Sequence, residues 1–137
     1  GRPLSIVGDG PQKELLKNMA KDNIRFLGHV PNDRLPEIYG RHDVFILPSR
    51  YEPWGLVVEE ALFRGLPVIA SDKVGSAADM VAALETGAVF SLSAPDGLSN
   101  AIHEVEKNYE TMARRVADIN WNSRVETQLK AYTSLLD

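Results

Sequence analysis

Two glutamates and a glycine lie within a short segment of this chain, in a spacing that suits the binding of phosphate and hydroxyl groups. Glu52 and Glu60 are separated by seven residues, and Gly55 lies between them. Glycine lets backbone approach a ligand closely. A helix that begins directly after Gly55 leaves the amides of Leu56 and Val57 unpaired at its positive dipole end, which is a ready phosphate site. A carboxylate about one turn inside that helix, at Glu60, can accept two hydrogen bonds from vicinal hydroxyls such as those of a ribose.

Each of these residues also has a structural interpretation. Acidic residues in the first turns of a helix are favoured by the dipole alone, so Glu59 or Glu60 taken singly would be structural or solvated. Trp54 taken singly would be a packing residue. The agreement of spacing, Gly55 and position after a strand favours the binding interpretation. In that interpretation Glu52, which precedes the turn, binds sugar hydroxyls beyond the phosphates.

Short apolar runs alternate with helix-like stretches along the chain and predict the elements that position this segment. The runs are rich in Val, Ile, Leu and Phe and span residues 4–7, 24–27, 44–47, 68–70 and 88–90. Helices are expected after Pro11, after an N-cap at Asn32, from about Leu56 to Arg64, from Pro95 onward, and in a last segment from Trp121. This pattern predicts an α/β, doubly wound, Rossmann-like parallel sheet of about five strands, with helices on both faces and a helical C-terminal tail.

Ligands of such sheets bind beyond the carboxyl ends of the strands. Four glycine-bearing or polar loops occupy those ends, at residues 8–10, 28–30, 48–55 and 71–76. The binding site is therefore predicted at that rim. Asp9 and Asp72, which lie in two of these loops, are interpreted as turn residues.

Composition narrows the class of protein. The chain has 137 residues, 44% hydrophobic and 25% charged, which predicts one globular domain over residues 1–137. A net charge of −4 argues against a nucleic-acid partner, and the absence of cysteine excludes disulfides and thiolate metal sites. No apolar run approaches the roughly 20 residues of a membrane-spanning helix.

Several motifs in sequence order carry a resemblance to a known family. Besides the paired glutamates they are Gly8-Asp-Gly-Pro11, Phe26-Leu-Gly-His-Val30, Asp43-Val-Phe-Ile-Leu-Pro-Ser49 and Gly65-Leu-Pro-Val-Ile-Ala-Ser-Asp72. With these motifs the chain resembles the C-terminal, donor-binding domain of a family 4 retaining glycosyltransferase of the GT-B fold. Trp54 stands where the family usually has Phe. The segment Val74–Met80 keeps Gly75 but departs from the family's Gly-Gly and Pro-Glu.

The resemblance assigns roles to individual residues. Glu60 would hold the ribose hydroxyls of a nucleotide-diphosphate sugar, and Glu52 would position the transferred sugar. The backbone of Trp54 and Gly55 would line the sugar pocket. The remaining donor-binding residues are the Leu56 and Val57 amides at the distal phosphate, Val30 near the base, and Gly8 in the first glycine loop.

The resemblance also implies an activity and a context. The reaction would transfer a glycosyl group from the donor to an acceptor hydroxyl with retention of configuration and without a metal or other cofactor. An N-terminal acceptor domain, and a first strand followed by an Arg and a Lys that neutralise the diphosphate, are expected elsewhere or on a partner chain. The isolated chain is therefore expected to be inactive. Enzymes of this family often serve polysaccharide biosynthesis. The resemblance therefore implies a cytoplasmic location, with peripheral association of the full-length enzyme at the inner face of the membrane.

Three other hypotheses remain open at this point. The chain can be a non-catalytic nucleotide-sugar-binding module that needs a partner chain for turnover. It can be a domain of a nucleotide-sugar epimerase, against which the spacing of the glutamates argues. A flavodoxin-like regulatory domain would need an acidic cluster at the strand ends, and only Asp9 and Asp72 come near that.

Overall fold

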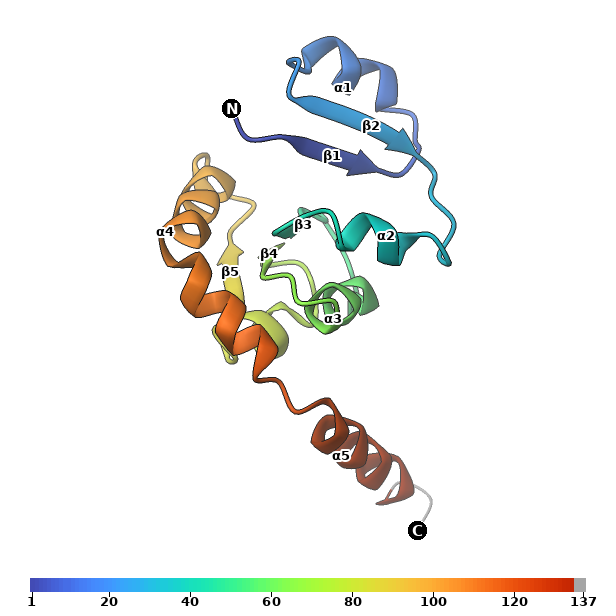
Figure 1. Ribbon diagram of the computed structural model, residues 1–137, viewed down its shortest axis with the longest axis vertical. Helices are drawn as coiled ribbons and strands as arrows, with labels where there is room; N and C mark the ends of the chain where they lie inside the picture. The colour runs from blue at the N-terminus through green and yellow to red at the C-terminus, as the bar shows by residue number, and fades with distance from the viewer. Residues whose placement is uncertain (135–137) are drawn as a thin grey trace. The chain divides into compact units, whose positions relative to one another are not determined.

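The computed structural model describes residues 1–134, apart from the side chains at positions 128, 131 and 132. The last three residues of the predicted domain, 135–137, lie outside the described residues. The chain forms two compact units, Gly1–Ile38 and Tyr39–Asp137, and each is described by itself (Figure 1).

The first unit is a small parallel β–α–β arrangement. Strand β1 (Leu4–Val7) pairs in parallel with β2 (Ile24–Gly28), and α1 (Lys13–Met19) connects them. Ile6 lies opposite Phe26 in the register, and both side chains are half-buried. Helix α2 (Leu35–Tyr39) follows and leads the chain into the second unit.

The second unit is built on a parallel sheet in the order β3-β4-β5. Its strands are β3 (Phe45–Leu47), β4 (Val68–Ser71) and β5 (Gly87–Phe90). All four residues of the central strand β4 are buried. A strand covered on both faces reads as a continuous apolar run, because neither face needs polar side chains. This burial explains the unbroken run at Val68–Ala70 in the sequence.

Helices cover both faces of this sheet. On one face Ile69, Ala88 and Phe90 pack against three buried residues of α4 (Gly97–Ala117), namely Ala101, Val105 and Met112. Successive side chains of a strand point to opposite faces, so Val68 and Ala70 face the other layer. That layer consists of α3 (Leu56–Phe63) and η1 (Ala77–Ala82), which both pack on β4 and on each other. Figure 1 shows α3 and α4 on opposite sides of β4.

The predicted fold class is confirmed: the structure is α/β with parallel strands and a helical tail, α5 (Trp121–Ser134). The five described strands form two sheets of two and three strands, whereas the sequence predicted one sheet. Apolar runs locate strands but carry no information about which strands pair, so this division could not be foreseen. None of the described helices combines the length and apolarity needed to cross a membrane.

One helical prediction was wrong and one helix was not predicted. Asn32 is not an N-cap, because α2 begins only at Leu35. The preceding residues form a turn in which the Arg34 amide donates to the Pro31 carbonyl over 3.0 Å. The π-helix η1 (Ala77–Ala82) was not predicted, because no element was assigned to the stretch between the 71–76 loop and the last apolar run.

Candidate functional site

The loop that follows β3 is tied at its start to the end of β4. Ser71, the last residue of β4, is fully buried. Its hydroxyl donates a hydrogen bond of 2.6 Å to the Ser49 carbonyl and accepts one of 3.3 Å from the Lys73 amide. A buried hydroxyl with both a donor and an acceptor partner is fully compensated for its loss of water. Ser71 therefore holds the carboxyl ends of two neighbouring strands together.

The centre of the loop runs parallel to the segment that follows β4. Three backbone hydrogen bonds join the two: the Glu52 amide to the Lys73 carbonyl (3.1 Å), the Gly75 amide to the Glu52 carbonyl (2.9 Å) and the Ser76 amide to the Trp54 carbonyl (2.8 Å). Together they hold the backbone on both sides of Pro53, so the 52–55 loop is not a free surface loop.

Two glycines make this approach possible. A Cβ atom at Gly75 would lie 1.9 Å from the Pro53 carbonyl oxygen, so no side chain fits there. Gly55 has a φ of +89°, in the left-handed region that favours glycine, and a Cβ there would lie 3.0 Å from Val74 Cγ1. The sequence attributed Gly55 to ligand approach, and the structure adds a conformational reason for it.

The predicted helix N-terminus is present. Gly55 is the N-cap of α3, and the first backbone bond of the helix runs from the Val58 amide to the Gly55 carbonyl over 2.9 Å. No side chain caps this end, and the amides of Leu56 and Val57 donate to no acceptor among the described residues. Two unpaired N–H groups at the positive end of a helix form a site for an anion.

The three glutamates of this segment differ in their surroundings. The Glu59 carboxylate accepts a hydrogen bond of 3.0 Å from Trp54 Nε1. The carboxylates of Glu52, half-buried, and Glu60, exposed, form no hydrogen bond or ion pair with the described part of the chain. Burial raises the pKa of the Tyr39 hydroxyl, and the negative charge of Glu60 raises that pKa further. Glu60 therefore lies near the buried ring of Tyr39, and its carboxylate is available to a ligand.

An open groove of about 630 Å³ lies beside the loop, and Glu52 forms part of its wall. Tyr51, Asp72 and Lys73 line it as well. The hydrogen bond from the Leu92 amide is the main cause that lowers the pKa of Asp72, and the hydroxyl of Ser91 lowers it further. Asp72 thus joins the ends of β4 and β5, which confirms its interpretation as a turn residue.

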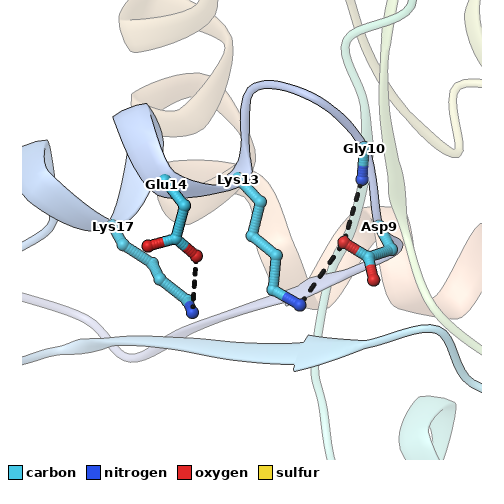
Figure 2. Close-up of polar contacts among 5 residues, drawn as sticks. All are labelled: Asp9, Gly10, Lys13, Glu14 and Lys17. Carbon is cyan, nitrogen blue, oxygen red and sulfur yellow. Dashed lines mark hydrogen bonds and ion pairs between the residues drawn. The ribbon is translucent and has the colours of Figure 1, made fainter.

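Gly8 and Val30, the other two predicted donor-binding residues, belong to the first unit. Gly8 has a φ of +126°, and its amide donates to the Gly28 carbonyl over 2.7 Å. Figure 2 shows the Asp9 carboxylate accepting a hydrogen bond from the Gly10 amide (3.0 Å) and forming an ion pair with Lys13 Nζ (3.3 Å). Val30 is half-buried and follows the end of β2. The residues that the structure brings together are therefore those of the second unit, from Glu52 to Glu60.

Sequence reasoning missed two parts of the site. It gave Glu59 no partner, although Trp54, five residues earlier, carries an indole N–H group that needs an acceptor. It also gave no reason for Gly75 beyond a family motif, because the approach of Pro53 depends on how two distant loops meet. Among residues 1–134, no group of three or more His, Asp or Glu side chains lies where it can hold a metal ion.

Comparison with known proteins identifies the family of the chain. The family model described as "Glycosyl transferases group 1" matches residues 2–120. A glycogen synthase of Mycobacterium tuberculosis is 29% identical over 145 residues, which cover 96% of this chain and 35% of that protein. A GDP-mannose-dependent alpha-mannosyltransferase of the same species is 36% identical over 117 residues, covering 82% of this chain and 30% of that protein.

A solved structure of 29% sequence identity shares the fold of the chain. The sucrose-phosphate synthase of Thermosynechococcus elongatus superposes with a TM-score of 0.70 at 29% identity, and the match covers 96% of this chain and 38% of that one. The chain thus spans about a third of the length of the relatives it matches.

Proposed function

Since this chain belongs to the glycosyl transferases group 1 family of the GT-B fold, we propose that it binds a nucleotide-diphosphate sugar at the junction of the 52–55 loop and α3. The reaction we propose is transfer of the glycosyl group to an acceptor hydroxyl with retention of configuration. The observation that carries the proposal is the pair of unpaired amides at Leu56 and Val57, flanked by the available carboxylates of Glu52 and Glu60.

Each group of this junction has a use in the proposed reaction. The Leu56 and Val57 amides would hold the distal phosphate and stabilise the charge that develops on the leaving diphosphate. Glu60 would accept hydrogen bonds from the ribose hydroxyls, and Glu52 would position the transferred sugar rather than attack it. The backbone of Trp54 and Gly55 would line the sugar pocket. Val30 and Gly8 belong to the first unit, and their assignments, Val30 to the base and Gly8 to the first glycine loop, stay predictions of the resemblance.

The extent of the match supports a further part of the proposal. Because the chain spans about a third of its relatives, we place residues 1–137 as the donor-binding half of a two-domain enzyme. The acceptor would then bind on an N-terminal domain or a partner chain, and turnover by residues 1–137 alone is not expected. A nucleotide sugar is the donor in the name of the mannosyltransferase relative, which supports this class of substrate.

The wider context belongs to the proposal as well. The donor would be used without a metal or other cofactor, because helix amides take the place of a cation at the phosphate. The full-length enzyme would act in polysaccharide biosynthesis in the cytoplasm, in peripheral association with the inner face of the membrane. The alternative is a non-catalytic module that binds a nucleotide sugar at the same junction and needs a partner chain for turnover.

Calorimetric titration with UDP-, GDP- and ADP-sugars tests this function. We expect the parent chain to bind one of them and Glu60→Ala to weaken binding at least about tenfold, since it removes two hydrogen bonds to a charged group. Glu104→Ala on α4 is the matched control, because its exposed carboxylate lies on a helix outside the proposed site. No binding at millimolar donor, or equal binding by Glu60→Ala, would contradict the proposal.

A further inference from the structure

We infer that Glu59 is a positioning residue, whose hydrogen bond with Trp54 holds the 52–55 loop against α3. The Glu59 carboxylate is then occupied by a contact within the protein, and the Glu60 carboxylate is the one that can bind a ligand. The inference rests on the proposed function for its effect on donor binding. The bond itself and its effect on the loop can be tested without any ligand.

The bond joins two parts of the chain that a flexible residue separates. Trp54 immediately precedes Gly55, and Glu59 lies in the first turn of α3. The indole Nε1 donates to Glu59 Oε1 over 3.0 Å, a good length for a bond between an N–H group and a carboxylate. The bond therefore spans the left-handed Gly55 and limits how the loop can turn relative to the helix.

Trp54 is held on its other side as well. Its carbonyl accepts the hydrogen bond of 2.8 Å from the Ser76 amide, which ties it to the segment after β4. One residue thus connects the start of α3, through its side chain, to the start of η1, through its backbone. Loss of the side-chain bond would leave only the backbone bonds to set the position of the loop above the Leu56 and Val57 amides.

The choice of side chains fits this role. An indole has a single donor and no acceptor, so Trp54 can use its N–H group only towards an acceptor such as Glu59. The bond lies at the surface, with Trp54 38% exposed and Glu59 half-buried, so water competes for both groups. Phenylalanine would fill the same space but could not form the bond.

The two adjacent glutamates are separated in space by the geometry of the helix. Successive residues of an α-helix lie about 100° apart around its axis. Glu59 faces Trp54, whereas Glu60 lies near Tyr39 and its carboxylate has no partner among the described side chains. The structure thus gives Glu59 a partner within the protein and leaves the Glu60 carboxylate, which the resemblance assigned to the ribose, without one.

Hydrogen exchange measured by NMR without ligand tests the bond. The indole N–H resonance of Trp54 is distinguished from that of Trp121 by the variant Trp121→Phe, which also serves as the control for a Trp-to-Phe change. We expect Glu59→Leu to speed exchange of the Trp54 indole at least about fivefold and of the Ser76 amide at least about threefold, with little change in Glu59→Gln, whose amide oxygen still accepts. Unchanged exchange in Glu59→Leu would overturn the inference.

A double-mutant cycle on donor affinity tests the positioning role. We expect Trp54→Phe and Glu59→Leu each to weaken donor binding about three- to tenfold, and the double variant to be no weaker than the poorer single variant. Glu59→Gln should restore affinity to within about twofold of the parent. Two outcomes would overturn the inference. In one, the losses of donor affinity in the two single variants multiply in the double variant. In the other, Glu59→Leu loses donor affinity without faster exchange of the Ser76 amide, which would mean that Glu59 contacts the ligand itself.

The two experiments separate this inference from the proposed function. A parent chain that binds no nucleotide sugar contradicts the proposed function, while the exchange rates still decide whether Glu59 holds the loop. Donor binding by the parent together with additive effects in the cycle supports the proposed function and contradicts the positioning role.

Discussion

Replacement of Gly75 by alanine should detach the 52–55 loop from the segment after β4. The new methyl carbon would lie 1.9 Å from the Pro53 carbonyl oxygen and 2.8 Å from its carbon, where both neighbours are backbone atoms. No rotation of a side chain can relieve this overlap, so the two segments must separate. Separation breaks the three backbone hydrogen bonds made by Glu52, Gly75 and Ser76.

The cost follows from those three bonds. At about 0.5–1.5 kcal/mol for each, their loss lowers the free energy of unfolding by about 2–4 kcal/mol. Urea denaturation of Gly75→Ala beside the parent measures it. Gly10→Ala is the matched control, because no atom lies within 4 Å of the added methyl, and it should change stability by less than about 0.5 kcal/mol. A Gly75→Ala variant as stable as this control would show that the contact with Pro53 does not constrain position 75.

Two further substitutions test the packing and the electrostatics of the second unit. Thr86→Val should lower the free energy of unfolding by about 1–2 kcal/mol, because the buried Thr86 hydroxyl donates to the Met80 carbonyl over 2.7 Å. The exposed Thr111→Val should cost less, and an equal cost in urea denaturation would contradict the account. Asp72→Asn tests how stability depends on pH. The pKa of the Asp72 carboxyl is lower in the folded state than in the unfolded state. The ionised carboxylate therefore stabilises the fold above the unfolded pKa, and this stabilisation is lost as the pH falls through the folded pKa. The variant should therefore be less stable than the parent at pH 7 and equal to it in acid; a difference that grows towards low pH would show that the sign is wrong.

Most of the local structure could be predicted from the sequence. Apolar runs between Gly, Pro and Ser identified every described strand to within about a residue, because the buried strands of a parallel sheet have no polar face. The position of α3 followed from Gly55 and from the Gly65 and Pro67 that end it. Apolar runs and the Gly and Pro residues that bound them act on neighbouring residues, so they can be recognised in a single sequence.

The features that the sequence did not predict depend on contacts between distant segments. The division of the strands into two sheets is a matter of pairing, which apolar periodicity does not encode. Position 75 needs glycine only because the Pro53 carbonyl approaches it. Ser71 joins two strand ends only because the Ser49 carbonyl lies within reach of its hydroxyl. The bond between Trp54 and Glu59 spans only five positions. It was still not predicted, because the helix dipole alone explains an acidic residue in the first turn of α3.

In the proposed function the N-terminus of α3 holds the diphosphate of the donor. The most direct measurement is the set of backbone ¹H–¹⁵N resonances of the chain during titration with UDP, GDP and ADP. We expect saturable shifts of the Leu56 and Val57 amides with one of these nucleotides, centred on Gly55 to Val57. Saturation that leaves those two amides unshifted, with the changes confined to other parts of the chain, would contradict the proposed function.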